Sequence, residues 1–104
     1  MGNFGLEPLI VEQIKQIFSN FENIEKVVIY GSRAKGNYRY NSDIDLSLFG
    51  EIAYDDFLKI EMQLDDLLLP YKIDLSIFDK IENQELKEHI LRVGIIFFKR
   101  NEKN

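Results

Sequence analysis

The arrangement of this chain follows from residues 31–49, which read GSRAKGNYRYNSDIDLSLF. The last seven, 43–49, alternate polar and apolar side chains, which predicts a β-strand with two chemically different faces. Residues 31–42 are rich in Gly, Asn and basic side chains, which predicts a loop with room for one helical turn. The β-branched run 26–30 just before the loop predicts a short buried strand. Because few residues separate the two strands, we expect them to be antiparallel neighbours.

The segments on either side predict three helices and one more strand. Apolar residues at helical spacing and strict alternation, respectively, place the helices over 8–21, 54–69 and 83–93 and the strand over 72–78. Pro8 suits the first turn of a helix, Pro70 is expected to end the second helix, and Gly94 follows the third as a C-terminal cap. Residues 95–98 fit either a last strand or an extended tail. This order predicts an α/β (α+β) fold, a small mixed sheet packed against helices.

Composition and charge narrow the class of protein. A chain of 104 residues, 45% hydrophobic and 30% charged, is expected to form a single domain over 1–104. The net charge of −5 resides in 51–66, whose acidic face could contact a basic partner or simply face solvent, while 33–39 is a small basic loop. Without a broad basic surface, no direct nucleic-acid partner is expected. The absence of cysteine, of a membrane-length apolar run and of a secretory signal predicts a cytoplasmic protein with no membrane partner.

Three aspartates are predicted to share one face of the sheet. Asp43 and Asp45 are two residues apart on a strand, so both side chains point the same way. Asp74 occupies the matching position in the strand over 72–78. Carboxylates brought this close repel one another unless a cation neutralises them, and Mg²⁺ prefers such oxygen ligands. The pattern therefore predicts a Mg²⁺ site of the kind that serves two-metal phosphoryl or nucleotidyl transfer.

A glycine–serine pair follows the first strand and points to phosphate binding. Gly31 allows backbone N–H groups to approach a phosphate closely, and the Ser32 hydroxyl adds a donor. Arg33 lies in the same loop and strengthens this interpretation. His89, the only histidine, is expected to point to solvent. With one histidine and no cysteine, the chain lacks the parts for a zinc site or a Ser-His-Asp hydrolase.

Gly31-Ser32, ten residues, then Asp43-Ile44-Asp45 and a later Asp74 resembles the nucleotidyltransferase superfamily that includes DNA polymerase beta. Its compactness is similar to that of the minimal nucleotidyltransferase (MNT) group, antitoxin-like proteins paired with HEPN-domain partners. The resemblance implies a nucleotidyltransferase fold in which Asp43 and Asp45 bind two Mg²⁺ ions. Asp74 would complete the catalytic metal site and help deprotonate the attacking hydroxyl. Gly31 and Ser32 would hold the triphosphate of ATP, with Arg33 as a further phosphate contact.

The same resemblance implies a function for the chain. MNT proteins transfer AMP to tyrosines of a co-encoded HEPN toxin, so we expect a Mg²⁺-dependent adenylyltransferase that acts as the antitoxin of a type VII toxin–antitoxin pair. One alternative is a binding module that neutralises its partner by masking alone, with weak or no catalysis. Another is a small-molecule, antibiotic-type nucleotidyltransferase working as a homo-oligomer. The nucleotide used and the oligomeric state stay open at this point.

Overall fold

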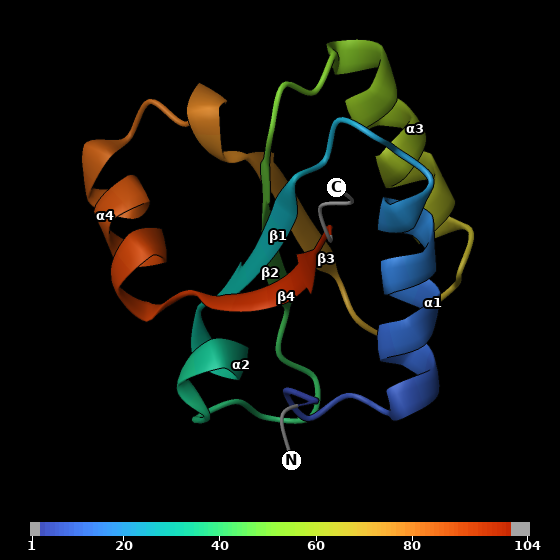
Figure 1. The fold of residues 1–104 in the computed structure, drawn as a ribbon. Helices are drawn as coiled ribbons and strands as arrows, with labels where there is room; N and C mark the ends of the chain where they lie inside the picture. The colour runs from blue at the N-terminus through green and yellow to red at the C-terminus, as the bar shows by residue number, and fades with distance from the viewer. Residues whose placement is uncertain (1–2, 101–104) are drawn as a thin grey trace.

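The computed structural model describes residues 3–100 and is built around one four-stranded sheet of order β3-β2-β1-β4 (Figure 1). The strands are β1 (Lys26–Tyr30), β2 (Ile44–Phe49), β3 (Ile73–Ile77) and β4 (Ile95–Lys99). β1 pairs antiparallel with both β2 and β4, whereas β2 and β3 are parallel. The predictions of a mixed sheet and of antiparallel neighbours are thus confirmed. The segment after Gly94, which the sequence left open, is the edge strand β4.

Helices cover the two faces of the sheet unequally. Their bounds are α1 (Pro8–Ser19), α2 (Ser32–Lys35), α3 (Tyr54–Asp65) and α4 (Gln84–Val93), and a 3₁₀ turn, η1, spans Phe78–Lys80. α1 and α3 lie together on one face, and α4 lies on the other (Figure 1). Within residues 3–100, no helix has the length and apolar character needed to cross a membrane.

The alternation along the strands explains why the two faces differ. Ile44, Leu46 and Leu48 of β2 point into the main core, which α1 and α3 complete with residues such as Ile14 and Ile60. A smaller cluster on the opposite face joins Val28 and Tyr30 of β1 to Ile90 of α4. α4 covers only part of that face, so polar residues of β2 and β3 on the same face remain accessible.

Several helix ends differ from the sequence-based predictions, since α1 ends at Ser19 rather than at residue 21 and α4 begins at Gln84 rather than at residue 83. α3 ends at Asp65 rather than at residue 69, because the chain turns there and Leu68 adopts a left-handed φ of +55°. Gly94 follows α4 as predicted, but its φ of −68° is not the left-handed conformation of a glycine cap. A Cβ at Gly94 would overlap Val28 and the carbonyl of Ile90. The glycine is therefore needed for space between α4 and β1.

Candidate active site

The structure brings the three predicted aspartates to one end of the α4 face. Asp45 and Asp74 are direct partners in the parallel register of β2 and β3, and strands in a sheet lie about 4.8 Å apart. Asp43 immediately precedes β2, two residues before Asp45. Asp43 and Asp74 are exposed, and Asp45 is half-buried. All three carboxylates therefore lie at the start of the parallel pair, with access to solvent.

The charges of these carboxylates act on one another. Burial, followed by the negative charges of Asp74 and Asp43, raises the pKa of Asp45 above its ordinary value, and His89 partly offsets this. A raised carboxyl pKa means that the ionised form lacks full compensation from its surroundings. A bound cation would supply that compensation.

Magnesium fits the donor set, although the ligands do not form a closed cage. Carboxylate oxygens are the ligands that Mg²⁺ prefers, and it commonly keeps several waters in its shell. Within the described range 3–100, no three acidic, histidine or cysteine side chains converge closely enough to enclose a metal ion. The site is thus a solvent-facing set of carboxylates of suitable chemistry, one that a metal–nucleotide complex could complete from outside.

The glycine–serine turn meets the carboxylates directly. Gly31 follows the last residue of β1 with a φ of +76° and starts α2, whose first residue is the half-buried Ser32. A Cβ at Gly31 would overlap the Oδ2 atom of Asp45. The glycine is required both for its left-handed backbone and for this close approach. The predicted phosphate-binding turn and the predicted metal-binding strand therefore touch at Gly31 and Asp45.

The position of the Arg33 side chain does not fit the phosphate contact predicted for it. Its side chain is only 1% exposed, and its guanidinium group donates hydrogen bonds to backbone carbonyls inside the protein. Four such bonds occupy most of the five N–H groups that an arginine carries. The structure therefore replaces the expected phosphate contact with an internal tie.

Two residues beside the carboxylates were missed or misjudged from the sequence. His89 was predicted to point to solvent, and that prediction is wrong: its ring packs edge-on against Tyr30 with centroids 6.2 Å apart. Tyr30 is the antiparallel partner of Asp45, and burial, then the charges of Asp74 and Asp45, raises the pKa of its hydroxyl. The sequence pattern indicated this orientation of His89, because the residue falls on the stripe of α4 that faces the sheet.

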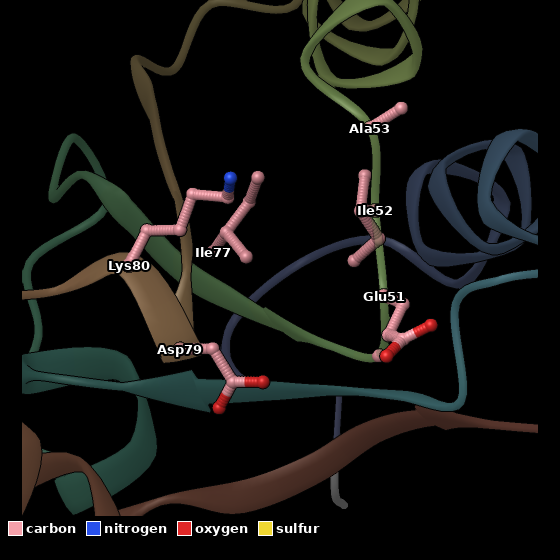
Figure 2. Close-up of a pocket in the computed structure, with 7 residues that line it drawn as sticks. Glu51, Ile52, Ala53, Ile77, Asp79 and Lys80 are labelled. Carbon is pink, nitrogen blue, oxygen red and sulfur yellow. The ribbon is translucent and has the colours of Figure 1, made fainter.

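A surface hollow of about 400 Å³ lies at the other end of the strands (Figure 2). Its walls are the segment that carries Glu51, Ile52 and Ala53 and, across from it, Ile77, Asp79 and Lys80. Gly50, also in its lining, is five residues beyond Asp45, which corresponds to about 16 Å along a strand. This hollow is therefore separate from the carboxylates, of which Asp43 and Asp74 are exposed at the surface.

A mixed sheet that holds carboxylates against a glycine–serine turn is the arrangement expected of a nucleotidyltransferase. The chain belongs to the polymerase beta nucleotidyltransferase family, whose sequence model matches residues 12–103. It is 26% identical over 100 residues to the candidate protein adenylyltransferase MJ0604 of Methanocaldococcus jannaschii, covering 88% of this chain and 97% of that protein. The superfamily assignment made from the motifs is confirmed.

Solved structures share the fold. A toxin–antitoxin complex with AMP-PNP gives a TM-score of 0.69 at 17% identity, covering 86% of this chain and 73% of that one. The complex of tri-AMPylated Shewanella oneidensis HEPN toxin with its MNT antitoxin gives 0.66 at 14% identity, covering 91% and 74%. A Sulfolobus solfataricus structure described as a candidate nucleotidyltransferase gives 0.55 at 23% identity, covering 96% and 91%. At these identities the likeness establishes the fold, and the neighbours include the MNT–HEPN pairs that the sequence resembles.

Proposed function

We propose that this protein transfers AMP from ATP to a tyrosine of a HEPN-type toxin and thereby acts as the toxin's antitoxin. The observation that carries the proposal is the contact between the Gly31 turn and Asp45, with Asp74 beside it in register. This contact puts a group suited to hold a triphosphate directly against groups suited to hold its metal ions.

Each residue then has a defined task. Backbone N–H groups at Gly31 and Ser32, with the Ser32 hydroxyl, hold the triphosphate. Asp43 and Asp45 would hold two Mg²⁺ ions, and Asp74 would complete the ligand set. When bound, Mg²⁺ supplies positive charge that stabilises the reacting phosphate and the leaving group. The acceptor oxygen bonds to the α-phosphorus, the bond from that phosphorus to pyrophosphate breaks, and the hydroxyl proton passes to the Asp74 carboxylate.

The open shape of the site supports a protein as the acceptor. Asp43 and Asp74 are exposed to solvent, so a side chain of another protein can reach the carboxylates. The relative MJ0604, 97% of whose length is matched, is named as a candidate protein adenylyltransferase. Fold neighbours include an antitoxin in complex with an AMPylated HEPN toxin. These similarities favour a HEPN-type protein over a free small molecule.

Transfer of label from α-³²P-ATP to the co-encoded HEPN protein in the presence of Mg²⁺ tests the proposal. We expect label on that protein with wild type and with Glu51→Gln, which removes an acid at the far end of the strands. We expect none with Asp43→Asn/Asp45→Asn, or after removal of Mg²⁺ with a chelator. A partner that is silenced without becoming labelled would contradict the proposal and support masking by binding alone.

A further inference from the structure

Arg33 is a buried cation whose hydrogen bonds within residues 3–100 go to backbone carbonyls rather than to a carboxylate. Its Nη1 donates to the carbonyl of Phe4 (2.9 Å), and its Nη2 donates to the carbonyls of Tyr40 (3.1 Å) and Ser42 (2.9 Å). Its Nε donates to the Ser42 carbonyl as well (3.1 Å). Burying a charge is costly unless such bonds compensate it. A group held in this way fixes the relative positions of the segments that supply the carbonyls.

Two aromatic rings extend the same attachment to a further segment. The Arg33 guanidinium carbon lies 5.3 Å from the centroid of the Tyr38 ring and 4.8 Å from that of Tyr71. Such distances allow favourable cation–π contact. Tyr71 lies three residues before Asp74 along the chain, and Tyr38 belongs to the loop that leads to Asp43. Arg33 thus contacts the approaches to both strands that carry the carboxylates.

The other hydrogen bonds of the loop before Asp43 are local among the described residues. The N–H of Arg39 donates to Ser42 Oγ (2.8 Å), and the N–H of Ser42 donates to the Arg39 carbonyl (3.0 Å). These bonds close a turn but do not join it to α2. Residues 37–41 are exposed, and the packing contact of this stretch is the Tyr38 ring, which lies against Gly5. The bonds from Arg33 link the turn to the helix that starts at Ser32.

We propose that Arg33 is a positioning residue that sets the phosphate-binding turn against the metal-binding carboxylates. It sits one residue after Ser32 and binds the carbonyl of Ser42, the residue directly before Asp43. Any change in this tie changes how Gly31 and Ser32 face Asp43 and Asp45. The inference rests on the proposed function in one respect, that these two groups bind the same metal–nucleotide complex. In this proposal Arg33 does not contact phosphate, and it affects nucleotide binding only through the position of the turn.

Arg100 offers a matched control far from the site. Its guanidinium group also donates to three backbone carbonyls, those of Phe18 (3.3 Å), Phe21 (2.8 Å) and Ile24 (3.0 Å). It also lies over an aromatic ring, that of Phe98. These bonds tie the residue that follows β4 to the end of α1 and to the loop before β1, at the end of β1 opposite Gly31. A lysine at either position keeps the charge but lacks the planar fork that reaches several carbonyls at once.

The test compares wild type, Arg33→Lys and Arg100→Lys by the affinity for AMP-PNP with Mg²⁺, measured calorimetrically, alongside thermal stability. We expect both variants to melt at lower temperatures. Only Arg33→Lys should weaken AMP-PNP binding, by about tenfold or more, because small displacements of aligned groups are costly. In the transfer assay its KM for ATP should rise more than its kcat falls. Amide hydrogen exchange of residues 40–45 should accelerate in Arg33→Lys alone.

Unchanged AMP-PNP affinity in Arg33→Lys, or an equal loss in both variants, would overturn the inference. So would a wild type that fails to bind AMP-PNP. A wild type that binds AMP-PNP in an Arg33-dependent way but labels no HEPN protein would overturn the proposed function and leave the positioning role standing. If Arg33→Lys does not fold, Tyr71→Leu removes one ring contact and keeps the four hydrogen bonds. Its AMP-PNP affinity should then fall about two- to fivefold, and an unchanged affinity would overturn the inference.

Discussion

The two faces of the sheet differ sharply although the same strand, β2, contributes to both. On the α1/α3 face, Ile44, Leu46 and Leu48 are completely buried. On the α4 face, Ser47 is buried and bonded to Ser76, but Asp45 is only half-buried, and Asp43 just before it is exposed. Because side chains alternate along β2, the residues packed on the α1/α3 face also fix the backbone that carries Asp45 on the α4 face. Packing on one side therefore holds the strand that carries Asp45 in place, while the carboxylates on the other side keep access to solvent.

The largest effect on stability is expected from a substitution on the α1/α3 face. Leu46→Ala removes a fully buried side chain beside Asp45 in sequence and should lower the free energy of unfolding by about 3 kcal/mol. Chemical denaturation measures this loss. Once corrected for the folded fraction, transfer by the variant should approach that of wild type, because the carboxylates themselves are untouched. Loss of transfer at full folding would show that the two faces are not separable.

Gly31→Ala should affect both stability and function. The left-handed φ and the overlap with Asp45 should together cost about 2 kcal/mol of folding free energy. AMP-PNP binding should also weaken, because the added methyl group lies between the turn and the carboxylate. Gly36→Ala is the control, since Gly36 has a φ of +91° but no atom lies within 4 Å of the point that an added Cβ would occupy. Equal effects of both variants on AMP-PNP affinity would contradict the role assigned to the Gly31 contact.

A smaller effect is expected at the junction of α4 with the open face. His89→Gln removes the edge-on contact with Tyr30 and should lower stability by about 1 kcal/mol. It also removes a group that lowers the pKa of Asp45, so the pH at which transfer is half-maximal should shift upward. Glu88→Gln, at an exposed neighbouring position, should leave the pH profile of transfer unchanged. A profile unaffected by His89→Gln would place His89 outside the electrostatics of the site.

The smallest effect concerns the metal-free protein. Because the pKa of Asp45 is raised on folding, its contribution to stability is present at acidic pH and is lost as pH rises through the folded pKa. At neutral pH without Mg²⁺, Asp45→Asn should therefore be slightly more stable than wild type. Its free energy of unfolding should be higher by less than about 1 kcal/mol, since the group is partly exposed. This difference should vanish at a pH below the ordinary carboxyl range. A variant less stable than wild type at neutral pH would contradict the unfavourable crowding of the three charges.

The sequence predicted the parts of this molecule that follow from local patterns. Alternation placed Asp43 and Asp45 on one face, and the parallel register of β2 and β3 confirms Asp74 as a neighbour. Arg33 could not be placed in this way, because its partners Phe4 and Tyr71 are distant in sequence and meet only in the folded chain. The position of His89 on the apolar stripe of α4 indicated that it faces the sheet, but its partner Tyr30 is known only from the folded chain. Candidate site residues can thus be predicted from local sequence patterns, whereas the hydrogen bonds and ring contacts that position them depend on tertiary structure.

The central claim is that the carboxylates on the α4 face serve to transfer AMP to a HEPN-type partner. The most direct test is the intact mass of that partner after incubation with ATP, Mg²⁺ and this protein. We expect the mass to increase by whole AMP units with wild type, and not to increase with Asp45→Asn. An unmodified partner with wild type, or an equal increase with Asp45→Asn, would contradict the claim.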